Sequence, residues 1–415
     1  MPASLTPRRE LWLLLSLAGI QFTHILDFMI MMPLGPQLTA LFGISDAKFG
    51  LLVSAYTFAA GASGLVASTY IDRFGRKRLL ITLYVLFAIA TLACGLAPTY
   101  GALMAARIAA GIFGGVLSAL SQTIVGDVIP FERRGRAMGI VMTSFSIATV
   151  AGVPLGLFMA AHLSWHAPFF GIAALCGVIA CIAAVVMPQL TAHVQAGRDS
   201  SALGGIAQVL SDRNHLKAFG FSALLMFAGF TVIPYITIYM QTNVGLRTEQ
   251  VPYLYLCGGV VTLFTARLFG RLTDRVGKVP MLRVLAIAVL VPMFATTLMG
   301  PSPMWLAIVV STCFFTFMSG RMIPGMAILT SAANPRLRGT FMTLNASVQS
   351  AAMGLAAFLG GLIISRDAQG LVQNYWMAAV LGAVASLGAV WLAGRLTLHG
   401  SGSPAIAAVG QPAKN

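Results

Sequence analysis

Charged residues are scarce in this sequence, and their scarcity excludes an ordinary water-soluble domain. They make up 9% of its 415 residues, whereas a soluble domain carries about a quarter. Acidic residues are the rarer sign, with 11 Asp and Glu against 26 Lys and Arg. Hydrophobic residues reach 58%, and the mean hydropathy is +0.87. The composition therefore indicates a chain that is mostly embedded in lipid.

Motifs of familiar catalytic sites are also missing. No HExxH, GxSxG or P-loop pattern occurs, and no acidic cluster could hold Mg²⁺. The five cysteines form no CxxC pair, and no histidines have metal-ligand spacing. We therefore expect no enzyme, no ATP-driven pump, no metal and no other cofactor. A non-transporting membrane sensor stays a distant alternative, although the polar segment 191–214 is too short for a signalling domain.

Long apolar runs are abundant and predict membrane-spanning helices. About 20 apolar residues cross the ~30 Å of hydrocarbon in a bilayer as a helix. The third and ninth runs are short, so an odd number of spans stays open. Twelve spans are predicted at roughly 11–36, 49–70, 79–97, 101–126, 137–160, 168–188, 216–241, 251–272, 282–300, 304–330, 340–364 and 373–394.

The basic residues gather on one side of this predicted topology. Twenty of the 26 lie at the ends or loops of that side, and only Lys48, Arg247 and Arg366 lie on the other. The positive-inside rule then places both termini in the cytoplasm. The net charge of +15 is thus a topology signal and does not indicate nucleic-acid binding. We expect the first apolar run to be a retained helix, because it continues past Asp27 without a signal-peptide cleavage site.

Asp27 is the acidic residue that lies inside an apolar run. An ionisable group at bilayer depth costs roughly 2.5–3.5 kcal/mol on insertion scales and usually faces a polar cavity. Gln21 and His24 precede it at three-residue spacing and share its helix face. This polar stripe predicts a wall that faces water, with Asp27 as a proton site. The alternative is an acid that only pairs with a structural partner.

Two motifs recur at nearly the same offset and predict an internal duplication. The run 72–77, Asp-Arg-Phe-Gly-Arg-Lys, returns at 274–278 as Asp-Arg-Val-Gly-Lys, and Arg134-Gly135 returns as Arg338-Gly339. Each falls after the second or fourth span of its half. The predicted domains are an N-terminal six-helix bundle (1–190), a cytoplasmic linker (191–214), a C-terminal six-helix bundle (215–396) and a flexible tail (397–415).

The loop 72–78 resembles the signature of the major facilitator superfamily between spans 2 and 3. One departure is Ser68, where that family has Gly; the second copy keeps Gly270. The resemblance implies an all-α membrane protein with twelve transmembrane helices in two six-helix pseudo-repeats and both termini cytoplasmic. It also implies a latch across the cytoplasmic face that holds the outward-facing state. The alternative is that the basic residues of this loop only fix the topology. The implied latch residues are Asp72, Arg73, Gly75, Arg76, Asp127, Asp274, Arg275 and Gly277.

Two more resemblances concern spans 4 and 5. Arg107 begins a segment similar to the superfamily's span-4 Arg motif, and an Arg within a span needs a counter-charge or a polar cavity. The other reading is an Arg that bonds nearby backbone carbonyls. Gly152, Pro154 and Gly156 resemble the antiporter signature, in the variant of arabinose-efflux-like exporters, which implies efflux. His166 stands where such relatives often have Arg.

The substrate site is expected between the two halves near the bilayer midplane, as in other duplicated transporters. Asp27, His24 and Arg107 are the candidates for proton coupling. Each cavity candidate could equally be a polar contact between helices. The candidates that we expect to line a substrate cavity are Gln21, Tyr56, Tyr235, Tyr239, Arg321, Asn345 and Gln349.

The sequence thus predicts a secondary active transporter that exports a small organic molecule, such as a drug or sugar, in exchange for protons. Asp27 would take a proton from outside and release it inside while the halves rock about the cavity. We expect a multi-pass monomer in the inner membrane of a bacterium, without a nucleic-acid partner. Uptake by proton symport or by facilitated diffusion uses the same residues and stays the alternative.

Overall fold

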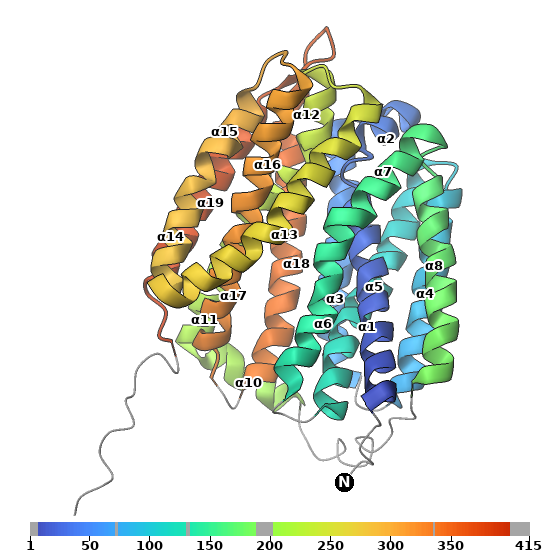
Figure 1. Ribbon diagram of the computed structural model, residues 1–415, viewed down its shortest axis with the longest axis vertical. Helices are drawn as coiled ribbons and strands as arrows, with labels where there is room; N and C mark the ends of the chain where they lie inside the picture. Colours follow the sequence, from blue (N-terminus) through green and yellow to red (C-terminus); the bar gives the residue numbers. More distant parts are fainter. Residues whose placement is uncertain (1–6, 71–73, 130–132, 188–201, 335–336, 399–415) are drawn as a thin grey trace, which may run out of the picture.

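The computed structural model describes residues 7–70, 74–129, 133–187, 202–334 and 337–398. Within these ranges, twelve helical segments are long and apolar enough to cross a membrane. They stand roughly side by side as two groups, blue to green and yellow-green to red in Figure 1. The predicted all-α fold with twelve spans is confirmed. The start of α1 and the end of α19 lie at the same end of the bundle, which is called the terminal face here. The other end is called the opposite face.

The first group holds the first six spans. Its helices are α1 (Pro7–Ile30), α2 (Gly35–Phe42), α3 (Asp46–Tyr70), α4 (Arg76–Leu96), α5 (Tyr100–Val128), α6 (Arg134–Ile147), the π-helical turn η3 (Ala148–Gly152), α7 (Val153–His162) and α8 (Ala167–Val186).

The second group holds the last six spans and a short preceding helix. Its elements are α10 (Ala202–Ser211), α11 (Arg213–Phe230), η4 (Ile233–Tyr235), α12 (Ile236–Thr242), η5 (Thr248–Gln250), α13 (Val251–Val276), α14 (Lys278–Ala288), α15 (Leu290–Leu298), α16 (Met304–Gly320), α17 (Met322–Ala332), α18 (Arg338–Ile363), β1 (Ser365–Arg366), β2 (Val372–Gln373) and α19 (Tyr375–Ala393).

Proline interrupts several spans that the sequence predicts as single helices. Helices α11, α14 and α16 end at Phe230, Ala288 and Gly320, and a proline follows four residues later in each case. Proline lacks the N–H that would bond the carbonyl four residues before it, and its ring clashes with that carbonyl. The first predicted span, 11–36, likewise breaks after Ile30, before Pro33, and continues as α2. Asp27 therefore lies in the last turn of α1, although the span as a whole continues beyond it.

The two groups meet along their longest helices. Helix α3 of the first packs along α18 of the second, and α13 packs on η3 and α7. A feature absent from the predicted fold is the hairpin of β1 and β2 between α18 and α19, which pairs Ser365 with Gln373 and Arg366 with Val372. It lies at the opposite face, where it presents Arg366 to α3.

Candidate transport site

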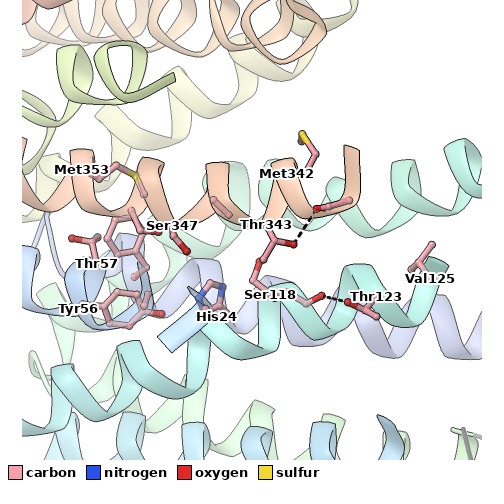
Figure 2. Close-up of a pocket in the computed structure, with 18 residues that line it drawn as sticks. His24, Tyr56, Thr57, Ser118, Thr123, Val125, Met342, Thr343, Ser347 and Met353 are labelled. Carbon is pink, nitrogen blue, oxygen red and sulfur yellow. Dashed lines mark hydrogen bonds between the residues drawn. The ribbon is translucent and has the colours of Figure 1, made fainter. Parts of the chain in front are cut away.

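A cavity of about 750 Å³ lies between α3 and α5 of the first group and α18 of the second. Its inner end, in the middle of the bundle, is lined by Tyr56, Thr57 and Met353. From there it runs along α5 and α18 to Val125 and Met342, near the terminal face (Figure 2). The cavity therefore connects the middle of the bundle with one face of the molecule.

The inner end of the cavity combines aromatic rings with polar atoms. The rings of Phe28 and Tyr56 stack with centroids 5.4 Å apart, and the His24 ring lies 6.2 Å from that of Tyr56. A Cβ at Gly114 would lie 2.5 Å from His24 Cδ2 and 2.8 Å from the Tyr56 hydroxyl, so glycine lets α5 approach both rings. The two ring nitrogens of His24 and the hydroxyl of Tyr56 have no hydrogen-bond partner among the described residues. These unpartnered atoms are buried in residues that line the inner end of the cavity.

A buried ion pair lies directly behind this end of the cavity. Arg107 Nη1 donates to Asp27 Oδ2 at 2.9 Å and to the Asp27 carbonyl at 3.2 Å. Both side chains are fully buried. The guanidinium carbon of Arg107 lies 4.3 Å from the centroid of the Tyr56 ring, a cation–π contact. Tyr56 therefore separates the ion pair from the cavity.

The ion pair leaves some of its buried polar atoms without a partner. Asp27 Oδ1 and Arg107 Nε and Nη2 are buried without a partner among the described residues. Buried polar groups are usually all bonded, and exceptions concentrate at functional sites. The sequence left two interpretations of Arg107, a pair with a counter-charge or bonds to backbone carbonyls. The structure shows both, because Arg107 bonds the carboxylate and the carbonyl of Asp27.

Among the first-half candidates, the structure brings four close together. His24 and Tyr56 line the cavity, while Asp27 and Arg107 lie behind it. Gln21 is buried on the same side of α1 and donates from Nε2 to Ser118 Oγ at 3.3 Å. Ser118 itself lines the cavity.

The two tyrosine candidates of the second half lie towards the opposite face. The Tyr235 hydroxyl donates to the carbonyl of Ala357 on α18, and the Tyr239 ring packs on Tyr375 with centroids 4.9 Å apart. Both side chains are buried, and neither is among the residues that line the cavity in this conformation.

Two of the three remaining second-half candidates form hydrogen bonds between helices. Arg321, fully buried, donates from Nη1 to Ser386 Oγ at 3.2 Å and from Nη2 to the Leu225 carbonyl at 2.9 Å. Gln349 Nε2 donates to Ser222 Oγ of α11 at 2.9 Å, and Asn345 is buried. In this conformation Arg321 and Gln349 bond neighbouring helices, and none of the three side chains is among those that line the cavity.

Sequence reasoning missed the hydroxyl-bearing residues that line the cavity walls. On α18, Thr343, Ser347 and Ser350 follow the helical spacing of four and three residues, a stripe that could have been recognised. On α5, Ser118 and Thr123 face them (Figure 2). Asn345 and Gln349 drew attention instead because amides are more polar, yet they lie on another face of the same helix.

At the opposite face the two groups of helices are joined. Arg366, on the hairpin, donates from Nε to Asp46 Oδ2 at 2.8 Å and from Nη2 to Asp46 Oδ1 at 2.7 Å. Hydrogen bonding to Asp46 raises the pKa of Arg366, so its guanidinium stays charged at any pH at which cells live. Nearby, the rings of Phe49 and Tyr235 meet edge to face at 6.2 Å across the same boundary. These contacts close the end of the bundle that the cavity does not reach.

Part of the predicted latch lies outside the described residues. This concerns Asp72 and Arg73, and nothing is described of the Asp127 side chain. Arg76 is buried at the start of α4, and Gly75 before it has φ −62°, a value that any residue adopts. The second copy differs: Gly277 has φ +103° between α13 and α14, a conformation that favours glycine. Asp274 and Arg275 are exposed in the last turn of α13.

The Gly152-Pro154-Gly156 motif lies against the helix that carries Asp27. Gly152 ends the π-helical turn, and a Cβ there would meet the Leu26 side chain at 3.0 Å. A Cβ at Gly156 would meet the Ile30 side chain at 2.7 Å. The motif therefore gives α7 a close contact with the last turn of α1.

Relatives of known name and fold agree with this architecture. The chain is 26% identical over 351 residues to the uncharacterized MFS-type transporter YtbD of Bacillus subtilis, covering 83% of this chain and 85% of the relative. It is 21% identical over 370 residues to Multidrug resistance protein 2 of the same organism, covering 88% and 91%.

Solved structures of the same fold include a D-xylose–proton symporter, with a TM-score of 0.75 at 17% identity, covering 92% of this chain and 97% of that one. They also include a bacterial homologue of the human lysosomal transporter Spinster in an inward-facing, occupied conformation, with a TM-score of 0.74 at 16% identity, covering 95% and 98%. The family model described as Major Facilitator Superfamily matches residues 17–357 and 224–411. Twelve spans in two groups, a cavity between the groups and this match together show that the chain belongs to the major facilitator superfamily of membrane transporters.

Proposed function

We propose that this transporter exports a small organic molecule in exchange for protons. The observation that carries the proposal is the buried Asp27–Arg107 pair, which contacts the cavity-lining Tyr56 ring through its guanidinium. A titratable acid at this depth is costly and is retained mainly where it serves a proton or substrate pathway. Its place beside the cavity links its protonation to the binding of a substrate.

Protonation of Asp27 would remove the counter-charge of Arg107. At the 2.9 Å separation of the pair, one unit of charge is worth several kcal/mol even at an effective dielectric constant of about 20. The freed guanidinium would then act on the cavity through Tyr56. Protonated and deprotonated Asp27 would thus favour different substrate affinities, which is the differential interaction that a coupled transporter requires.

Alternating access assigns roles to the two faces. We take the terminal face as cytoplasmic, because most Lys and Arg residues lie there and the positive-inside rule applies. The cavity then opens inward, and the Asp46–Arg366 pair closes the outward side. In the outward-facing state this pair would separate, and contacts at the terminal face would close.

Export is favoured over import by two observations. The chain is similar to a protein named for multidrug resistance, and its antiporter-like motif packs against the last turn of α1 beside Asp27. The likeness to the D-xylose–proton symporter concerns the fold alone. Uptake by symport remains the reading against which export is tested.

Everted membrane vesicles distinguish the two directions. Compounds that an overexpressing strain tolerates better than a knockout strain supply the labelled substrates. An exporter that exchanges its substrate for protons accumulates the compound when the vesicle interior is acidified, and a protonophore abolishes the accumulation. Loss of preloaded compound under the same gradient would instead establish symport, and indifference to the gradient would establish facilitated diffusion.

A further inference from the structure

The cavity wall carries hydroxyl groups but no formal charge. Of the described residues that line it, none is Asp, Glu, Lys or Arg; its titratable side chains are those of His24 and Tyr56. A charged solute that enters such a cavity loses hydration without gaining a counter-ion, which costs several kcal/mol.

The nearby ion pair does not supply the missing counter-charge for a cation. Asp27 already bonds Arg107, and both are fully buried. The group that makes a cation–π contact with the cavity-lining Tyr56 is the Arg107 guanidinium. The Tyr56 ring covers this guanidinium, so the ion pair gives neither a cation nor an anion in the cavity a counter-ion in direct contact.

The hydroxyl groups on the walls leave acceptors for a ligand. Thr123 donates its hydroxyl proton to the Ala119 carbonyl at 3.0 Å, and Thr343 donates to the Gly339 carbonyl at 3.2 Å. A hydroxyl that donates to its own helix keeps two lone pairs. At the inner end the His24 nitrogens and the Tyr56 hydroxyl add unpartnered polar atoms.

Apolar side chains occupy the rest of the lining. Phe28 presents a ring at the inner end, already stacked between Tyr56 and Phe230. Met342 and Met353 contribute flexible thioether side chains from α18. Methionine surfaces adapt to ligands of varied shape. The lining thus suits a molecule with one apolar or aromatic part and one part rich in hydrogen-bond donors.

We propose that the cavity binds an uncharged, hydroxyl-bearing amphiphile, whose aromatic or apolar part packs at Phe28 and whose hydroxyls bond the walls formed by α5 and α18. This rests on the proposed function in taking the cavity as the transport site. It goes further in excluding lipophilic cations and organic anions as preferred substrates.

The test is a binding measurement at equilibrium on the purified full chain in lipid nanodiscs, without a proton gradient. The probes are phenyl β-D-glucoside, its 4-carboxyphenyl analogue and its 4-(aminomethyl)phenyl analogue, which differ in charge on one scaffold. The neutral glucoside is expected to bind at least tenfold more tightly than either charged analogue. Equal or tighter binding of a charged analogue, or no binding of the neutral one, would overturn the proposal.

A substitution in the cavity wall makes the test reciprocal. Ser347→Asp places a carboxylate in the lining, with Ser347→Asn as the uncharged control of the same size. The aspartate variant should move the ratio of cationic to neutral affinity by at least tenfold, and the asparagine variant should leave it unchanged. Thr343→Asp with Thr343→Asn provides a second position if the first aspartate variant does not fold. An unchanged ratio in a folded aspartate variant would show that the probes bind elsewhere.

The two proposals fail separately. Binding without a gradient does not depend on proton coupling or direction, so a symporter or facilitator would still show the neutral preference. Conversely, gradient-driven accumulation in everted vesicles with a preference for charged probes would keep the exporter and discard only the substrate class.

Discussion

Arg366 binds both carboxylate oxygens of Asp46 across the boundary between the two groups of helices. Asp46 begins α3, and Arg366 belongs to the hairpin that follows α18, two helices that also pack along each other. Two parallel bonds between a guanidinium and a carboxylate add geometric specificity to the attraction. The pair is therefore placed to bias the equilibrium between the two orientations of the halves.

Arg366→Gln should weaken the closed opposite face. Because the Arg366 side chain is about a third exposed, screening limits the effect to about 1 kcal/mol, or a roughly fivefold change in the ratio of conformers. A cysteine placed at Thr343 should then react more slowly with a membrane-impermeant maleimide added from the terminal face. The exchanged double variant, Asp46→Arg with Arg366→Asp, should return the rate towards its original value. If Arg366→Gln alone leaves the rate unchanged, the pair does not bias the conformers.

Gly50→Ala should act at the same boundary by steric conflict. A Cβ at Gly50 would lie 2.1 Å from the Tyr235 hydroxyl and 2.8 Å from the Ala357 carbonyl, both from the second group of helices. Because these atoms belong to the second group of helices, separating the groups at the opposite face would relieve the conflict, so the variant should favour the conformer that is open there and lower labelling at Thr343. Gly101→Ala, at the start of α5, is the matched control, because nothing lies within 4 Å of its added Cβ. Equal labelling of the two variants would contradict the assigned closure.

Composition and apolar run length predicted the twelve spans because both follow directly from the thickness of hydrocarbon and the cost of burying charge. The breaks within spans were less well predicted, since the run of apolar residues continues through Pro33, Pro234 and Pro324 while the helix does not. Asp27 and Arg107 stood out individually because each is a rare charge at depth. Two such charges at depth could be expected to pair, and the structure shows the pair. The contacting atoms could not be read from the sequence, which does not give the rotation of α1 against α5.

The second half of the site was harder to predict for a different reason. A polar side chain in a membrane helix serves equally well as a bond between helices or as a cavity wall, and sequence does not distinguish them. Gln349 and Arg321 bond neighbouring helices, whereas the less conspicuous Ser347 lines the cavity. The hairpin at Arg366 gave no apolar or periodic signal, because two-residue strands carry too few side chains for one.

Asp27→Asn should abolish gradient-driven transport while leaving protein level and membrane insertion intact. Asparagine keeps the size of the side chain and removes the titratable group, so Arg107 loses its counter-charge permanently. Substrate exchange without a gradient should persist. Glu249→Gln, an exposed acid at the opposite face, is the control and should transport normally. Uphill transport by the Asp27→Asn protein would exclude Asp27 as the coupling residue.

Arg107 offers the sharpest test of whether the ion pair is functional or only structural. Arg107→Gln leaves a buried carboxylate without its cation, a loss that typically costs about 3–5 kcal/mol, so the variant should melt well below the wild type at neutral pH. Adding Asp27→Asn removes the stranded charge and should recover most of that loss. Arg107→Lys keeps the charge but loses the planar head that stacks on Tyr56, so it should fold while transporting poorly and with an altered pH profile.

The double variant, Arg107→Gln with Asp27→Asn, separates a role in folding from a role in coupling. If the pair is merely structural, restored stability should bring back proton-driven transport. We expect a stable protein that exchanges substrate and ignores the proton gradient. Recovery of coupled transport in that double variant would assign the pair to folding alone.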